Sequence, residues 1–189
     1  MTAGDVRFVE LYQRFHRHVY GYCRRRTNAD LVEDAVAEIF LTVWRKIDQA
    51  PEGDGSLPWL YGVAFRVLQS QWRGLSRRRR LSDKLASIGA ESVMGPEDYI
   101  IMGDESRMIH EALGRLKPTD REILRLTAWE ELAQSDVALA LGISVGAVRQ
   151  RLYEARKNLT REFNRLEKEP STSPAAQKGG AWWQQKNVL

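Results

Sequence analysis

The segment QSDVALALGISVGAVRQRLY, residues 134–153, constrains the fold more than any other part of the chain. Ala138 is small enough to let a second helix cross close to the first. Gly142, four residues later, suits a turn that needs a positive φ. Val148 then supplies an apolar side chain that packs back onto the first helix. This spacing predicts a helix-turn-helix, a motif that places its second helix in the major groove of DNA.

The residues around this motif fit the same interpretation. Ser144 is placed to cap the second helix, whose exposed side carries Arg149, Gln150 and Arg151 for contacts with base edges or phosphates. Apolar side chains complete a small predicted core: Leu139, Leu141, Ile143 and Leu152. A plain helical hairpin, in which the glycine only ends a helix, is the alternative.

Helical periodicity extends along the rest of the chain. Apolar residues recur at helical spacing in residues 5–26 and 30–48, and again from Pro58 into an arginine run that ends at Arg80. A further helix is predicted over 106–116. Thr119-x-x-Glu122 is then predicted to form a capping box at the start of the next helix.

These patterns predict an all-α fold with two small helical domains. The expected boundaries are 5–80 for the first domain and 106–166 for the second, which contains the helix-turn-helix. Residues 81–105 lose the periodicity and contain glycine and proline, so we expect a flexible acidic linker there. Residues 167–189 are expected to be a disordered tail, although Trp182 and Trp183 are unusual in one.

The net charge is only +4, but charges are sorted along the chain. Residues 57–80 carry Arg66, Arg73 and the run Arg77 to Arg80 with no acid. Residues 81–105 carry many acids against the single cation Lys84. A solvated surface rarely separates charges in this way, so the pattern indicates two different partners.

The sequence also indicates a cellular setting. The single cysteine, Cys23, excludes an internal disulfide and fits a reducing cytoplasm. No signal peptide is visible in MTAGDVRFVE, and no apolar run approaches the ~20 residues of a membrane span. We therefore expect a soluble, cytoplasmic protein without membrane insertion.

Catalytic motifs are weak. His16 and His18 are two residues apart on a predicted helix and face different ways, and His110 is isolated. Cys23 lies beside cations that could lower its pKa, but it has no resolving cysteine and is expected to be half buried. The sequence shows neither a glycine-rich phosphate loop nor a nucleophile elbow. We expect no enzyme activity, no metal site and no cofactor.

The order of three motifs resembles the extracytoplasmic-function (ECF) sigma factors of bacterial RNA polymerase, in the sigma-70 superfamily. The motifs are DLVEDAVAEIFLTVWRKI, LPWLYGVAFRVLQSQWRGLSRRRR and, after the acidic segment, RLKPTDREILRLTAWEELAQSDVALALGISVGAVRQRLYEARKNL. The resemblance covers about residues 8–166. It implies a non-catalytic subunit that binds core RNA polymerase and directs promoter-specific initiation. Such a subunit recognises −35 and −10 elements and captures the melted −10 strand.

The resemblance assigns polymerase docking to the helix predicted over 30–48. The implied partner is a coiled coil of the largest subunit, and the matching residues are Asp34, Glu38, Leu41, Trp44 and Arg45. On a helix, most of these share a face distinct from the apolar stripe. A mixed acidic and apolar face suits a basic helical partner, and an ordinary solvated face is the alternative.

The resemblance assigns −10 strand capture to residues 59–80. Capture needs cations for phosphates and flat side chains for an unstacked base. Trp59 and Tyr61 fit the core at least as well as a base platform, and Trp72 fits either. Arg66 stands where many relatives carry Asn, which leaves the base preference open. The matching residues are Arg66, Gln69, Ser70, Trp72, Arg73, Arg77, Arg78, Arg79 and Arg80.

In the second domain, the resemblance assigns −35 reading to Arg149, Gln150 and Arg151. Phosphate contacts, which position without specifying, fall to Ser144, Arg156 and Lys157. Ala133-Gln134 departs from the Ser-Tyr or Ser-Pro of many relatives, so Ser135 is the expected cap there. The implied partners are promoter DNA, the polymerase flap for this domain, and an anti-sigma factor. The acidic linker either threads toward the RNA exit path or is a plain tether.

Two other functions remain open from sequence. A repressor or response-regulator output domain would bind duplex DNA as a dimer without polymerase, but it leaves the 30–48 motif unexplained. An interaction adaptor would use a sigma-like fold to bind an anti-sigma protein and no DNA. The arginines at 77–80, 149 and 151 argue against this adaptor.

Overall fold

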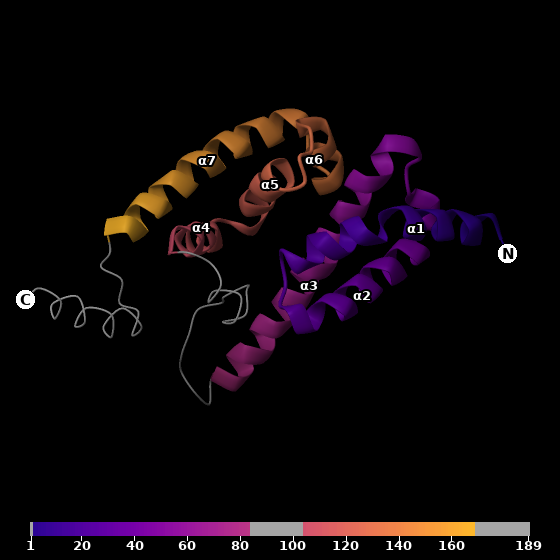
Figure 1. Cartoon of the computed structure of the whole chain (residues 1–189), viewed down its shortest axis with the longest axis horizontal. Helices are drawn as coiled ribbons and strands as arrows, with labels where there is room; N and C mark the ends of the chain where they lie inside the picture. The colour runs from indigo at the N-terminus through magenta and orange to yellow at the C-terminus, as the bar shows by residue number, and fades with distance from the viewer. Residues whose placement is uncertain (1, 84–103, 169–189) are drawn as a thin grey trace, which may run out of the picture.

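The computed structural model describes residues 2–83 and 104–168, and every regular element in these ranges is helical (Figure 1). The N-terminal domain consists of α1 (Ala3–Arg24), α2 (Val32–Arg45) and α3 (Ser56–Asp83), with short 3-10 turns at Ala29–Leu31, Ile47–Gln49 and Gly53–Gly55. The C-terminal domain consists of α4 (Asp104–Gly114), α5 (Pro118–Ala128), α6 (Gln134–Leu141) and α7 (Val145–Lys168). The predicted all-α fold with two helical domains is confirmed.

The core of the N-terminal domain comes from one face of each helix. Val19, Ile39, Val43 and Leu60 are fully buried where α1, α2 and α3 pack together. Burying each such side chain contributes about 1.5–3 kcal/mol relative to exposure. At the N-terminus of α1, the Thr2 backbone N–H donates to the Asp5 carboxylate at 2.6 Å. The Asp5 backbone N–H returns a bond to the Thr2 hydroxyl, which completes a capping box.

Helix α3 is the longest element of the N-terminal domain and extends beyond its packed part (Figure 1). It begins at Ser56, whose hydroxyl donates to the Pro51 carbonyl oxygen at 2.8 Å. Pro58 therefore lies in the first turn, where a missing N–H costs nothing. The helix continues through Asp83, so the first residues of the predicted linker are helical. The remainder of that linker, 84–103, and the tail from 169 onward lie outside the described residues.

The predicted helix-turn-helix consists of α6 and the first part of α7. Gly142 has a φ of 68° and ends α6 in the left-handed conformation. The Ser144 hydroxyl accepts a bond from the Ala147 backbone N–H at 3.1 Å, which confirms it as the cap of α7. Val148 is fully buried, as predicted, and packs with Ala138 and Leu152 in one apolar cluster.

Two local predictions in this region are wrong. Leu139 is 44% exposed rather than buried in the motif. Its methyl group lies instead near Gly55 of the N-terminal domain, 3.5 Å from where a Cβ would stand. Ser135 does not cap α6, because the helix begins one residue earlier, at Gln134, with Ala133 as its N-cap.

The predicted capping box at Thr119 and Glu122 is also wrong. Helix α5 begins at Pro118, and its N-cap, Lys117, makes no side-chain capping bond. Proline at the first position needs no such bond for its own nitrogen. Glu122 is buried and instead accepts a bond from the Tyr22 hydroxyl of α1, in the other domain.

The two domains contact each other along a surface that we call the interdomain seam, where α1 and α3 meet α5 and α6 (Figure 1). Gly62 of α3 lies directly against the backbone of α6. A Cβ at Gly62 would stand 2.1 Å from the Ala140 carbonyl oxygen. Only glycine permits this approach, because any side chain would overlap the facing backbone.

Candidate nucleic-acid interface

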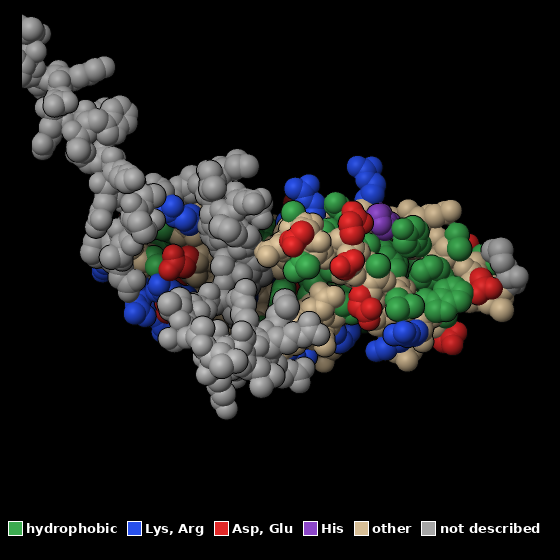
Figure 2. Space-filling view, turned by 90° about the horizontal axis from the view of Figure 1, so that it is seen from below, with side chains coloured by type: hydrophobic (Ala, Val, Ile, Leu, Met, Phe, Trp, Pro, Cys, Tyr) green, Lys and Arg blue, Asp and Glu red, His purple; other side chains and the backbone are tan. Residues whose placement is uncertain are grey.

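Helix α2 presents the residues that the resemblance assigned to docking. Asp34, Glu38, Leu41, Trp44 and Arg45 are all exposed, while the opposite side of the helix forms the core. Leu41 and Trp44 are each 43% exposed, which is unusual for large apolar side chains on a packed helix. Figure 2 shows apolar and acidic side chains side by side over the N-terminal domain, on the right of the view. The arrangement suits a partner that offers both apolar and basic groups.

Helix α1 extends this apolar surface, which the sequence analysis did not identify. The Phe8 ring meets Trp44 edge-on at 5.0 Å between centroids, and Tyr12 meets Phe40 at 4.7 Å. Tyr12 remains 41% exposed at this contact. Contiguous exposed apolar groups often mark interaction sites. The missed signal was the apolar content of 6–12, which exceeds what one core-facing stripe needs.

A groove of about 530 Å³ lies between α2 and α3. Asp34 and Glu38 line it from α2, and Arg66 and Ser70 line it from α3. The resemblance placed these residues in two separate sites, whereas the structure brings them to one groove. The α2 wall carries the acids Asp34 and Glu38, and the α3 wall carries the cation Arg66. A ligand in the groove would therefore contact a docking candidate and a DNA-binding candidate together.

The candidates on α3 divide by burial. Arg66, Ser70 and Arg73 are exposed, whereas Gln69 and Trp72 are half-buried. Trp72 packs against the core with Trp59, although part of its ring remains accessible. The side chains of Arg77, Arg78, Arg79 and Arg80 lie outside the described residues.

Tyr61 belongs to the core rather than to a base platform. It is buried and stacks on Tyr22 of α1, with ring centroids 5.0 Å apart and planes at 21°. Burial, and then the charge of Glu130, raises the pKa of the Tyr61 phenol. The ring faces into the protein, so we exclude it from the candidate interface.

The candidates on α7 also take different directions. Arg149 and Gln150 are exposed, and Gln150 lies 3.5 Å from Glu154 one turn along the helix. Arg151 instead pairs with Asp120 at 3.0 Å, which ties α7 to α5. The remaining candidates, Ser144, Arg156 and Lys157, are exposed, and the Ser144 hydroxyl is already used as a cap.

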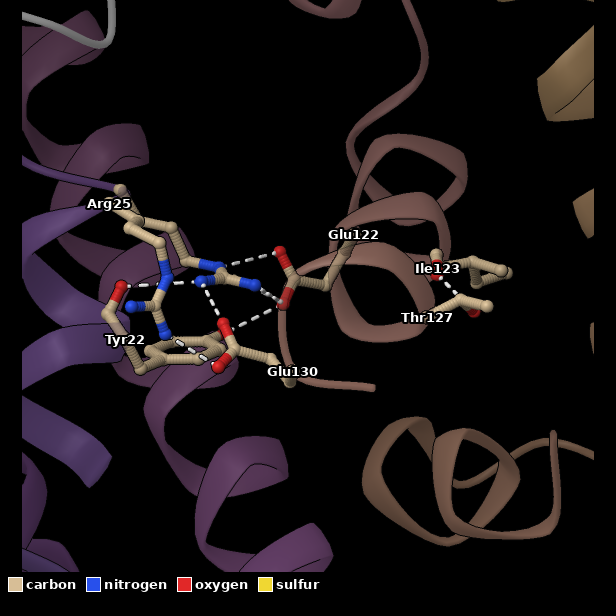
Figure 3. A network of polar contacts seen from close by, with 7 residues as sticks. Tyr22, Arg25, Glu122, Ile123, Thr127 and Glu130 are labelled. Carbon is tan, nitrogen blue, oxygen red and sulfur yellow. Dashed lines mark hydrogen bonds and ion pairs between the residues drawn. The ribbon is translucent and has the colours of Figure 1, made fainter. Parts of the chain in front are cut away.

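A buried ionic network crosses the interdomain seam, and the sequence analysis missed it (Figure 3). The Arg26 Nε donates to both oxygens of Glu122 at 3.2 and 3.1 Å, and its Nη1 donates to Glu130 at 2.8 Å. The Tyr22 hydroxyl donates to Glu122 at 2.8 Å, and Arg25 pairs with Glu130 at 2.6 Å. The position of Glu122 beside the apolar run Ile123 and Leu124 was the available signal for a buried acid.

The electrostatics of this network favour the charged form of Arg26. Burial alone lowers the pKa of its guanidinium, but Tyr22, Glu122 and Glu130 raise it well above its usual value. The guanidinium also lies over the Tyr22 ring at 3.6 Å. The pKa of the Tyr22 phenol is raised, first by burial and then by Glu122. Arg26 therefore keeps its positive charge, and the Tyr22 phenol keeps its proton, throughout the physiological pH range.

Arg125 of α5 lies near this network without an acidic partner. It is 5% exposed, and its Nε donates to no acceptor among the described residues. Burial, and then the neighbouring charge of Arg26, lowers its pKa to about 10. Its guanidinium lies over the Trp129 ring, 5.2 Å from the ring centroid, which compensates part of this cost. The C-terminal domain thus buries a cation that is only weakly stabilised.

The remaining chemical candidates belong to the framework of the fold. Cys23 is completely buried, so the expectation that it is half buried was wrong. His16 stacks on Phe40, and His110 stacks on Trp129. Within 2–83 and 104–168, we find no cluster of three acids, histidines or cysteines able to hold a metal. No helix in those ranges is long and apolar enough to span a bilayer.

Comparison with known proteins identifies both halves of the chain. Residues 11–78 match the family model "Sigma-70 region 2", and residues 106–159 match "Sigma-70, region 4". The RNA polymerase sigma factor NccH of Alcaligenes xylosoxydans xylosoxydans is 32% identical over 138 residues, which are 68% of this chain and 71% of NccH. RfaY of Xanthomonas campestris pv. campestris, named a probable RNA polymerase sigma factor, is 33% identical over 135 residues. That match covers 69% of this chain but only 34% of RfaY.

The fold also matches a solved structure. The sigma factor RpoE of Bartonella quintana, solved with the anti-sigma factor NepR, aligns with a TM-score of 0.62 and 20% sequence identity. The alignment covers 86% of this chain and 98% of RpoE. With the sequence relatives and both family models, the chain belongs to the ECF sigma factors, the subunits of RNA polymerase that direct transcription initiation.

Proposed function

We propose that this sigma factor docks on core RNA polymerase through the exposed face of α2. The observation that carries the proposal is the surface of Asp34, Glu38, Leu41, Trp44 and Arg45, which is exposed while the opposite face of α2 fills the core. Basic groups on a coiled coil of the largest subunit would pair with the acids, and apolar groups would cover Leu41 and Trp44. Burial of those two side chains would contribute affinity, and the acids would orient the complex.

Recognition of the −35 element is assigned to α7. Arg149 and Gln150 are exposed near the N-terminal end of a capped helix, the part that reaches base edges in a major groove. Arg156 and Lys157 are placed one to two turns further along for phosphate contacts. The Arg151 side chain is 47% exposed, and among the described residues only its Nη1 contacts Asp120, so we assign it a second role in positioning α7 beside its contact with DNA.

Recognition of the −10 element is assigned to α3. Arg66, Ser70 and Arg73 offer cations and a hydroxyl along one exposed stretch, and Trp72 offers part of a flat ring. Gln69 and the arginines 77–80 complete the proposed strand-binding surface. Stacking of one unpaired base on an aromatic ring contributes ~1–3 kcal/mol.

The proposed partners are core polymerase, including its flap for the C-terminal domain, promoter DNA and an anti-sigma factor. RpoE was solved with NepR, and CnrH was solved with the cytosolic domain of CnrY. The fold shared with these two proteins supports an anti-sigma partner for this chain. A non-catalytic role in the cytoplasm follows from the same assignment.

The docking proposal is tested by reversing the acids of α2. The variant Asp34→Lys/Glu38→Lys places two cations against a basic partner, and like charges across an interface cost several kcal/mol. It should fold normally, because both residues are exposed, yet it should not co-elute with core polymerase or support transcription. The control Glu10→Lys/Asp48→Lys reverses two other exposed acids of the same domain. It should still co-elute with core polymerase and support transcription.

The same experiments distinguish a sigma factor from a repressor that binds DNA without polymerase. Full transcription by Asp34→Lys/Glu38→Lys would overturn the docking assignment. A wild-type protein that binds duplex DNA as a dimer, but never associates with core polymerase, would favour a repressor that works alone.

A further inference from the structure

The C-terminal half of α7 carries a cationic surface that extends well beyond the residues assigned to −35 binding. We call it the α7 patch. It lines a groove of about 590 Å³, and no acid lines that groove among the described residues. All six of its residues are exposed: Lys157, Thr160, Arg161, Asn164, Arg165 and Lys168. Four of the six are cations, so the patch suits an anionic partner.

Helical geometry places this patch on the reading face of α7. Residues share a face of an α-helix when their separation is close to a multiple of 3.6. Lys157, Arg161 and Lys168 follow Gln150 by 7, 11 and 18 positions, so all three lie on its side of the helix. The other side of α7 is buried against the domain core through Val148, Leu152 and Ala155.

The neighbouring acids leave the cations of the patch available. Glu162 is only 15% exposed, and it reaches Arg115 of α4 at 3.6 Å. Its other oxygen lies 3.7 Å from Arg161, whose side chain remains 70% exposed. A contact of this kind at the surface contributes little. Glu167 is exposed next to Lys168 but does not line the groove.

The length of α7 determines what its reading face can reach. The 18 positions from Gln150 to Lys168 correspond to about 27 Å of helix, whereas a major groove is about 12 Å wide. A helix that inserts its N-terminal part therefore continues past the bases to the flanking phosphates, as the basic regions of bZIP proteins do. The match to the region 4 family model ends at residue 159, so most of the patch lies beyond it.

We propose that the α7 patch binds the phosphate backbone of the duplex flanking the −35 element, as a second and sequence-independent DNA contact. This inference rests on the proposed function, because it takes the reading face of α7 to point toward DNA. The patch continues that face without interruption. Its described residues include no large apolar side chain, which a protein partner would need at the centre of an interface. Polar, positively charged surfaces are typical of DNA contacts.

The first test removes two charges from the patch. Arg161→Gln/Lys168→Gln keeps good helix formers at both positions. The control Arg17→Gln/Arg24→Gln removes two exposed cations from α1, and Arg24 lies in the last turn of its helix as Lys168 does. Both variants should melt as the wild type does, because all four side chains are exposed.

Binding to duplex DNA supplies the readout. The probe is a fluorescent duplex of about 30 base pairs and random sequence, titrated with the full chain between about 50 and 200 mM salt. We expect the patch variant to bind about tenfold more weakly at the lowest salt, and its slope of log K against log salt to fall by about 1.8. The control should change the slope by less than about 0.5. An unchanged slope in the patch variant would overturn the proposal.

Cross-linking identifies what the patch contacts in the working complex. Cys23 is completely buried, so an added surface cysteine can be labelled selectively with a photo-cross-linker. Labelled Arg161→Cys, assembled with core polymerase on fragments that the wild-type holoenzyme selects from a random library, should cross-link to duplex DNA. Labelled Glu111→Cys, on the helix behind α7, should not. Cross-linking of position 161 only to a polymerase subunit or to the transcript would overturn the proposal.

Failure of the proposed function gives a different result. If α7 does not read the −35 element, Arg149→Ala leaves the base preference of the holoenzyme unchanged. If only the present inference fails, Arg149→Ala still relaxes that preference, while Arg161→Gln/Lys168→Gln keeps the wild-type salt dependence.

Discussion

Arg125 carries a buried positive charge that the described residues do not neutralise. Burial lowers its pKa to about 10, so the folded protein holds the charged form less readily than the unfolded chain does. Replacing it by the similarly long, uncharged Met removes this desolvation and leaves the contact with Trp129 apolar. We expect Arg125→Met to raise the free energy of unfolding by ~1–2 kcal/mol. Urea denaturation measures this, and the exposed Arg149→Met should change it by less than ~0.5 kcal/mol.

Cys23 provides a pH-dependent contribution to stability. Burial raises the pKa of its thiol from 9.0 to about 12, whereas the unfolded thiol ionises near pH 9. The folded state therefore keeps a proton that the unfolded state loses. This contribution is complete below pH 9 and is lost as the pH rises toward 12, at up to ~1.4 kcal/mol per pH unit.

The variant Cys23→Ala should show a flatter decline between pH 8.5 and 10, measured by urea unfolding at several pH values. The pKa values of the buried Tyr22 and Tyr61 are also raised, but from 10.0, so they affect stability mainly above this window. Identical slopes for both proteins would show that the thiol does not titrate differently on folding.

Residues whose partners are close in sequence were predictable. Gly142 and Ser144 act within one turn of themselves, and both predictions are confirmed. Glu122 was assigned to a capping box with Thr119, three positions away, but its partner, Arg26, lies 96 residues away. Local pattern rules contain no information about such a pairing. The prediction that Leu139 is buried within the helix-turn-helix was wrong for the same reason, since its neighbour Gly55 belongs to the other domain.

At the level of elements, amphipathic periodicity located the helices well, because each one buries a single stripe. The predicted docking face of α2 is exposed, and its assignment to polymerase remains a prediction. The ends of the helices were less predictable. Helix α3 was expected to end with the arginine run at Arg80, but it continues to Asp83. Gly62 was a usable signal, since a glycine inside a strong helical pattern often marks a close helix contact.

Helix α7 combines two functions on different faces, which substitutions can separate. Arg149→Ala should cost ~1–3 kcal/mol in promoter affinity and relax the preference at one base pair. Lys157→Ala should weaken binding evenly across sequences and lower the salt dependence by about one unit. Arg151→Ala should also cost stability, because Asp120 loses its partner. Promoter mutants titrated against each holoenzyme measure these effects, and equal, sequence-independent losses for Arg149 and Lys157 would rule out base reading by α7.

The molecule as a whole differs most from what the sequence indicated. The resemblance described two domains on a tether, whereas the structure joins them through Arg26, Glu122 and the contact of Gly62 with α6. Sequence rules predict helices one at a time, and a seam depends on the faces that two separate domains present to each other. Its prediction would have required the pairing of residues about a hundred positions apart.

The seam changes the expected result of limited proteolysis. The sequence predicts first cleavage by trypsin around Arg77–Lys84 or Arg107, because that stretch offers many cationic sites and few large apolar residues. If the seam holds the domains together, the two wild-type fragments should still co-elute on gel filtration at low salt. The fragments of Gly62→Ala should elute separately, since the added methyl group prevents α3 from meeting α6. Separate elution of the nicked wild-type protein would show that the chain connection, rather than the seam, keeps its halves adjacent.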